Sequence, residues 1–113
     1  MVSEQLQRLC DIATQAHERV QANFTDINPI IGVNQRMRDS GFSADLMTID
    51  CAKTGKRIVL LLHDAHSDTL SYQFSSKNSE PETDFQQMAF DAFTAHVLYD
   101  WIVDYFSSQA TQR

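Results

Sequence analysis

Apolar side chains recur along the chain with two different periods, and these periods predict its helices and strands. From Ser3, a residue suited to a helix N-cap, apolar residues recur at three- and four-residue steps. The positions in this stripe are Leu6, Leu9, Ala13, Ala16, Val20 and Phe24. A single apolar stripe is typical of a helix that rests one face on a core. The first element is therefore predicted to be an amphipathic helix.

Three strands are predicted between residues 42 and 75. Ala44–Cys51 and Thr69–Ser75 alternate apolar and polar residues, which is the period of a strand with one buried face. Arg57–His63 is apolar on both faces, so it is predicted to be a central strand covered on both sides. Gly55 lies between the first two strands and suits the positive φ angle of a hairpin turn.

Residues 25–41 have a less regular pattern. Asn28-Pro29 is typical of a helix start and Ser40-Gly41 of a helix end. A short helix over residues 29–39 is therefore predicted, although Gly32 leaves an ordered loop as the alternative.

A long helix is predicted from Asp84 to Ser107, following a polar loop over Ser75–Thr83. This helix is apolar over most of its circumference, which indicates burial on more than one side. One apolar face is predicted to pack on the sheet. A second stripe consists of Phe90, Phe93, Val97 and Trp101.

These elements predict a single α+β domain over residues 1–113. Its core is a three-stranded antiparallel meander flanked by N- and C-terminal helices, in the order α-β-β-β-α. This order loosely resembles that of bacterial secretion-chaperone and toxin-immunity proteins, although no sequence motif is shared. The resemblance in architecture implies a protein-binding role.

Charge is distributed unevenly. Residues 1–63 carry seven acidic and seven basic side chains, so the entire net charge of −6 arises in residues 64–113. An acidic balance argues against nucleic acid as a partner, because phosphate recognition needs clustered Lys and Arg. The chain has no apolar run long enough to cross a membrane, and its start does not resemble a signal peptide. A cytoplasmic protein with two free cysteines, Cys10 and Cys51, is expected.

The segment His63-Asp64-Ala65-His66 and the following Asp68 contain the residue types that ligate metals. A small metal-binding protein or metal-dependent enzyme centred on His63, His66 and Asp68 is therefore one alternative. The spacing does not match the i, i+4 pair of a helical His-Glu-x-x-His site, and a solvated turn explains the same residues.

Other catalytic patterns are weak. Lys53-Thr54-Gly55-Lys56-Arg57 lacks both the first Gly and the final Ser/Thr of a phosphate loop. Cys51 and His63 could form a nucleophile–base pair across a hairpin, but Cys51 falls on the inward face of its strand. No cofactor is expected.

The sequence therefore favours a non-enzymatic, acidic protein-binding module, which would be an adaptor or a chaperone-like or immunity-like protein. Its expected partner is a second copy, in a two-fold homodimer, or another protein. Trp and Phe are enriched at the centres of interfaces, so the stripe Phe90, Phe93, Val97 and Trp101 is the predicted contact surface. The alternative is that the first helix or residues 29–39 cover this stripe. A small-ligand sensor domain, with the ligand held between sheet and helix, is a further alternative.

Overall fold

The computed structural model describes residues 4–24, 27–76 and 85–107. Its elements are α1 (Glu4–Asn23), β1 (Pro29–Asn34), α2 (Arg36–Asp39), β2 (Ala44–Cys51), β3 (Lys56–His63), the 3₁₀ turn η1 (Asp64–His66), β4 (Thr69–Ser76), β5 (Gln86–Ala89), the 3₁₀ turn η2 (Phe90–Ala92) and α3 (Ala95–Ser107). The predicted N-cap Ser3 and most of the predicted loop Ser75–Thr83 lie outside the described residues.

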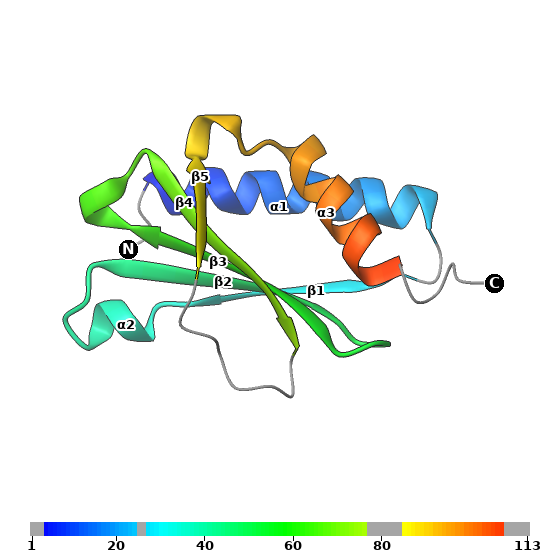
Figure 1. Cartoon of the computed structure of the whole chain (residues 1–113), viewed down its shortest axis with the longest axis horizontal. Coiled ribbons are helices and arrows are strands. Elements are labelled where there is room, and N and C mark those ends of the chain that lie inside the picture. Colours follow the sequence, from blue (N-terminus) through cyan, green and yellow to red (C-terminus); the bar gives the residue numbers. More distant parts are fainter. Residues whose placement is uncertain (1–3, 25–26, 77–84, 108–113) are drawn as a thin grey trace.

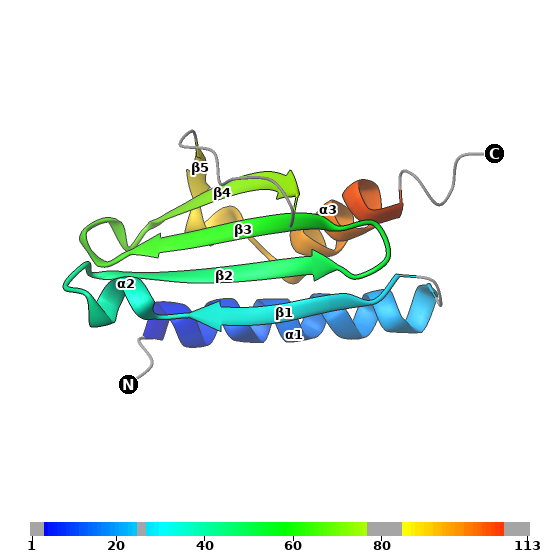
Figure 2. The same cartoon turned by 90° about the horizontal axis from the view of Figure 1, so that it is seen from below.

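The strands form one antiparallel meander in the order β1-β2-β3-β4-β5. Both α1 and α3 lie on one face of this sheet (Figure 1), and the view from below shows the other face without a helix in front of β2 and β3 (Figure 2). The α+β prediction with a helix at each end of the meander is confirmed. The sheet, however, has five strands where three were predicted.

The core lies between the sheet and the two helices. Alternate residues of the central strands are buried on the helix side: Met47, Ile49 and Cys51 from β2, Ile58, Leu60 and Leu62 from β3, and Leu70 from β4. From the helices come Leu6, Leu9, Ala13, Ala16 and Val20 of α1, and Leu98, Ile102 and Phe106 of α3. The predicted stripe of the first helix therefore does face the core. The register aligns the buried rows, because Ile49 pairs with Ile58 and Met47 pairs with Leu60.

The prediction of a helix over residues 29–39 is wrong. Residues 29–34 pair along their whole length with β2, from Pro29↔Cys51 to Asn34↔Leu46, and only Arg36–Asp39 is helical. The segment is rich in β-branched residues, which favour a strand when a neighbouring strand is present to pair with. Asn34 then ends the strand, because its side-chain oxygen accepts a hydrogen bond from the backbone N–H of Arg36 at 2.8 Å.

The predicted helix Asp84–Ser107 is also too long. Gln86–Ala89 pairs with Tyr72–Thr69 as β5, so main-chain hydrogen bonding to β4 overrides the helical propensity of this stretch. The chain then turns through η2, and α3 begins only at Ala95. Thr94 caps it, since the side-chain oxygen of Thr94 accepts a hydrogen bond from the N–H of Val97 at 3.2 Å.

The second face of β3 is not covered by a described helix or strand, contrary to the prediction (Figure 2). On this open face Val59 is nevertheless nearly buried, and Leu61 is half-buried beside its partner Leu46 on β2. One face of β3 therefore packs against the core beneath the helices, and its other face is partly exposed to solvent.

Leu60→Ala is expected to destabilise the fold by about 2–5 kcal/mol, because Leu60 is fully buried beneath the helices and its loss leaves a cavity. The matched control is Leu61→Ala, the next residue on the open face, which should cost clearly less. Urea denaturation of both variants measures the difference. Equal losses would mean that the core does not lie on the helix side.

Candidate functional site

The turn that contains the predicted metal ligands is held by an arginine. His63, Asp64, His66 and Asp68 are all exposed around η1. The guanidinium of Arg38, from α2, donates two hydrogen bonds of 2.9 Å to the Asp64 carboxylate. The same guanidinium donates bonds of 3.0 and 2.9 Å to Asp45, whose carboxylate is only 2% exposed. Arg38 thus ties α2 to β2 and to the turn after β3.

Within residues 4–24, 27–76 and 85–107, no three His, Cys, Asp or Glu side chains come together as a metal ion would need. The carboxylate nearest in sequence to His63 is engaged by Arg38 instead. The Arg38 hydrogen bonds hold the pKa of Asp64 below its usual range, and the Asp64 and Asp45 carboxylates raise the pKa of Arg38 further. Charge pairing therefore accounts for Asp64 without a metal.

The suggested pairing of Cys51 with His63 is wrong. His63 pairs with Ala44, at the opposite end of β2 from Cys51. Both cysteines are free, and Cys51 is buried in the core. Burial, with the nearby Asp11 carboxylate, raises the pKa of the Cys10 thiol, which keeps Cys10 in its less reactive protonated form.

The predicted stripe of four apolar residues does not form one surface, because two of its members precede α3. Phe90 and Phe93 are both buried in the core. Val97 and Trp101, on α3, are half-buried and pack against that core. Phe93 lies next to Trp101, with ring centroids 5.2 Å apart. Of the four residues, Trp101 is the one that opens onto a hollow in the surface.

This hollow lies between β4 and α3 and has a volume of about 430 Å³. It is lined by Phe74, Trp101, Asp104 and Tyr105. The rings pack on one another: the centroid of Phe74 lies 5.3 Å from Trp101 and 5.1 Å from Tyr105. The Tyr105 hydroxyl donates a 2.8 Å hydrogen bond to the Ser75 carbonyl, which fixes the helix against the strand. We call these four residues the aromatic hollow.

Of these four residues, Trp101 belongs to the predicted contact stripe, whereas Phe74 and Tyr105 were not predicted as site residues. Trp101, Asp104 and Tyr105 occur at positions i, i+3 and i+4. That spacing predicts that the three side chains share one face of the helix. Phe74 belongs to the apolar face of the alternating segment Thr69–Ser75, yet it is 36% exposed.

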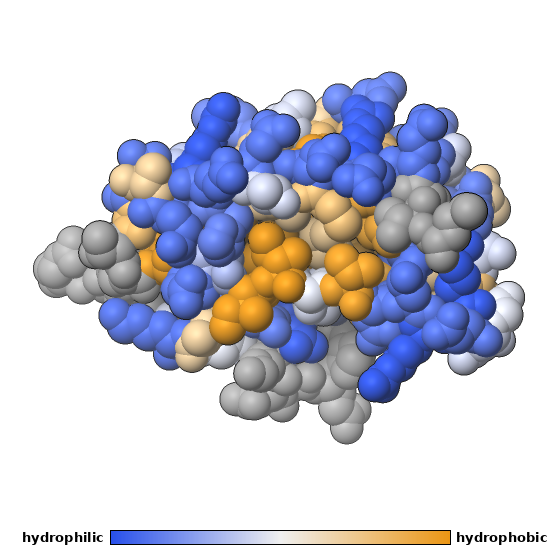
Figure 3. Space-filling view, turned by 180° about the vertical axis from the view of Figure 1, so that it is seen from behind, coloured by the Kyte–Doolittle hydropathy of each residue, from blue (hydrophilic) through white to orange (hydrophobic). Residues whose placement is uncertain are grey.

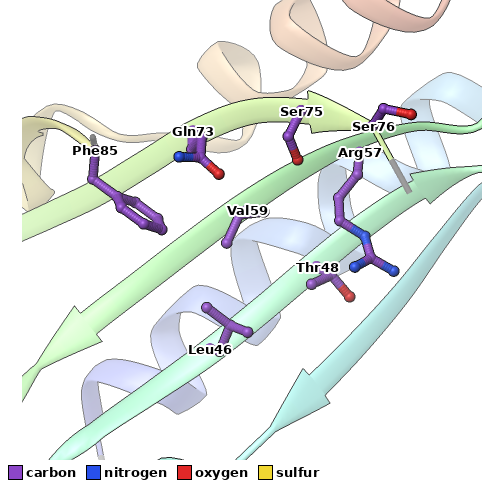
Figure 4. A pocket seen from close by; sticks show the side chains of 8 residues that line it. All are labelled: Leu46, Thr48, Arg57, Val59, Gln73, Ser75, Ser76 and Phe85. Atoms are coloured by element: carbon purple, nitrogen blue, oxygen red, sulfur yellow. The ribbon is translucent and has the colours of Figure 1, made fainter. Parts of the chain in front are cut away.

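A smaller pocket, of about 120 Å³, lies on the open face of the sheet. Figure 4 shows the Phe85 side chain reaching across the strands toward Val59, with Leu46 and Gln73 nearby. The charged residue in its lining, Arg57, is already held by Asp50 through hydrogen bonds of 2.6 and 3.0 Å. The pocket therefore offers apolar surface and hydroxyl groups but no general acid or base.

The remaining candidate is the outer edge of the sheet at β1. Ile30 is 51% exposed on the open face and Val33 is 46% exposed on the helix side. Apolar surface gathers along this side of the molecule in Figure 3. The strand reads Pro-Ile-Ile-Gly-Val-Asn and contains no charged residue. We refer to Pro29–Asn34, whose outer side pairs with no described strand, as the β1 edge.

Comparison with protein-family models, with curated proteins and with solved structures found no match in any of the three. In the part of the chain that the structure describes, no helix combines the length and the apolar character needed to span a membrane.

Asp64→Asn is expected to reduce stability most above pH about 4, the ordinary aspartate range, and to have little effect once the pH is below the folded pKa of Asp64. The pKa of Asp64 is lowered in the folded state, so its ion pair with Arg38 stabilises the fold above the unfolded pKa. That contribution disappears as the pH falls through the folded pKa.

Urea denaturation of wild type and variant over a pH series provides the measurement. Asp68→Asn serves as the control, because it removes an exposed carboxylate of the same turn for which the structure shows no ion pair among the described residues. If the difference in the free energy of unfolding between wild type and Asp64→Asn stayed the same in acid, the ion pair between Asp64 and Arg38 would not be its source.

Proposed function

We propose that the chain is a non-enzymatic protein-binding module that forms a homodimer by pairing its β1 edge with that of a second copy. The observation that carries the proposal is the character of this edge strand. Exposed edges in soluble proteins are usually protected by Lys, by Pro within the strand or by a bulge. The β1 edge has an uncharged sequence, and its Pro29 stands at the first position.

Apolar residues on both faces of β1 support the same proposal. Ile30 lies on the open face, while Ile31 and Val33 lie on the helix side, as their pairing with β2 dictates. An ordinary edge strand presents a polar face to water. A strand with partly exposed apolar side chains on both faces is suited to the interior of a larger sheet.

Symmetry favours a second copy as the partner. A two-fold axis perpendicular to the sheet makes β1 antiparallel to its own copy and keeps the helices of both copies on one face. In an antiparallel pair, directly opposite residues point to the same face of the sheet, so the residue at the axis pairs with its own copy. The two registers that pair most of β1 place either Ile31 or Gly32 at the axis. In both registers, every pair that forms between the two β1 strands on the helix side is made from Pro29, Ile31 and Val33.

Charge also permits self-association at this edge. The half of the sequence that supplies α1, β1, β2 and β3, residues 1–63, is neutral, whereas the excess of acidic residues belongs to residues 64–113. Two copies that meet at β1 therefore bring neutral halves together and keep their acidic halves apart. The proposed surface differs from the predicted stripe, of which Phe90 and Phe93 are buried.

Val33→Lys is expected to weaken dimerisation at least about tenfold, because the two-fold axis places two ammonium groups in one small apolar interface. Val33 is 46% exposed, so the folded monomer accommodates the lysine. Light scattering over a micromolar concentration series measures the molar mass of each species.

The matched control is Gln87→Lys, which places the same charge at an exposed position on β5, the opposite edge of the sheet. This variant should dimerise like wild type. A wild-type protein that is monomeric across the series, or a dimer indifferent to Val33→Lys, would refute pairing through β1.

A further inference from the structure

The aromatic hollow combines three aromatic rings with one carboxylate. We propose that it binds an arginine side chain from a basic segment of a partner protein. The site lies on β4 and α3, three strands away from β1 in the sheet order. The proposal is therefore independent of the homodimer and adds a second protein-binding surface.

The rings are held in place before any ligand arrives. Trp101 packs against Tyr72 at 4.6 Å, against Phe74 at 5.3 Å and against the buried Phe93 at 5.2 Å between ring centroids. A surface whose side chains are already ordered loses little conformational entropy on binding. The faces of Trp and of the other aromatic rings carry partial negative charge and attract cations.

Asp104 supplies the charge that makes the hollow selective for a cation. Its side chain is exposed at the hollow, and it forms no ion pair with any described residue. Asp100, one turn earlier on α3, lies 3.4 Å from His96 instead. Asp100 and Asp104 are the acidic side chains of α3, the helix that supplies three of the four residues of the hollow, and α3 contains no Lys or Arg. The local field therefore favours a basic partner.

The chain itself already places a cation at the margin of this site. The Lys56 ammonium lies 4.9 Å from the centroid of the Tyr105 ring and donates a 3.1 Å hydrogen bond to the Tyr105 carbonyl. Among the described residues, no cation lies over Trp101 or Phe74. The ligand is therefore expected to use these two rings together with Asp104.

Arginine fits this arrangement better than lysine does. The guanidinium is planar, stacks on aromatic faces, is more weakly hydrated than an ammonium and can donate two parallel hydrogen bonds to one carboxylate. A side chain on a partner segment also suits a hollow that is open at the surface, since the rest of the segment can lie across the margin. An enclosed cavity would instead suit a small free ligand.

Trp101 is the chain's single tryptophan, so its fluorescence reports directly on the hollow. A short glycine peptide that contains two arginines is titrated against the full chain. The matched peptides carry citrulline, a neutral isostere of arginine, or lysine in the same places. We expect a saturable change in Trp101 emission with the arginine peptide, a weaker response with lysine and none with citrulline.

Asp104→Asn is expected to weaken binding of the arginine peptide about tenfold, because one charge-assisted contact is lost. Asp100→Asn is the matched control on the same helix and should leave binding unchanged. Circular dichroism verifies that both variants are folded. Val33→Lys should also bind the peptide normally, which separates this site from the dimer interface.

The proposal is overturned if the arginine peptide gives no saturable signal up to millimolar concentration. Equal binding of the citrulline peptide would also overturn it, since the hollow would then be a nonspecific apolar patch. Equal effects of Asp104→Asn and Asp100→Asn would show that general charge, rather than the hollow, attracts the peptide.

Discussion

Burial of one face of the sheet beneath α1 and α3 is the constraint on which the rest of the structure depends. Ile58, Leu60 and Leu62 of β3 occupy the centre of that face, and the apolar stripes of both helices meet over them. Because α1 and α3 both lie on one side, the other face of β2 and β3 has no helix of the described chain in front of it, and β1 is an edge among the described strands. The two surfaces proposed for binding lie at the margins of this layer, where the helices no longer cover the strands.

The parts of the fold that could be predicted are those with a strong local pattern. The stripe of α1 recurs at helical spacing over five turns, and the buried positions match it. The strands β2, β3 and β4 were predicted to within one residue, because the alternation of β2 and β4, the continuous apolar run of β3 and the turn at Gly55 are all local signals.

The two wrong segments share a physical cause, which is pairing with a distant strand. Pro29–Asn34 and Gln86–Ala89 are short, and both become strands only because β2 and β4 offer backbone groups to bond with. Local propensity carries no information about such a partner. The predicted contact stripe required one uninterrupted helix from Asp84 to Ser107. Because α3 begins only at Ala95, Phe90 and Phe93 precede it and are buried in the core. Trp101 kept its place because it lies within the true helix.

Helices α1 and α3 pack against each other on the same face of the sheet, and this has a consequence for how the chain folds. Contacts between the first helix and the segment around α3 span almost the whole sequence; the Arg8–Asp91 ion pair alone joins residues 83 positions apart. Such long-range closure must precede completion of the core, and closing a large loop costs conformational entropy before any contact rewards it. The meander can form from neighbouring segments, and α1 precedes it in the chain, but its apolar face is not fully covered until α3 also packs on it. During synthesis, the part of the sheet that α3 covers therefore stays exposed until α3 has left the ribosome, and apolar surface exposed in this way is prone to misassembly.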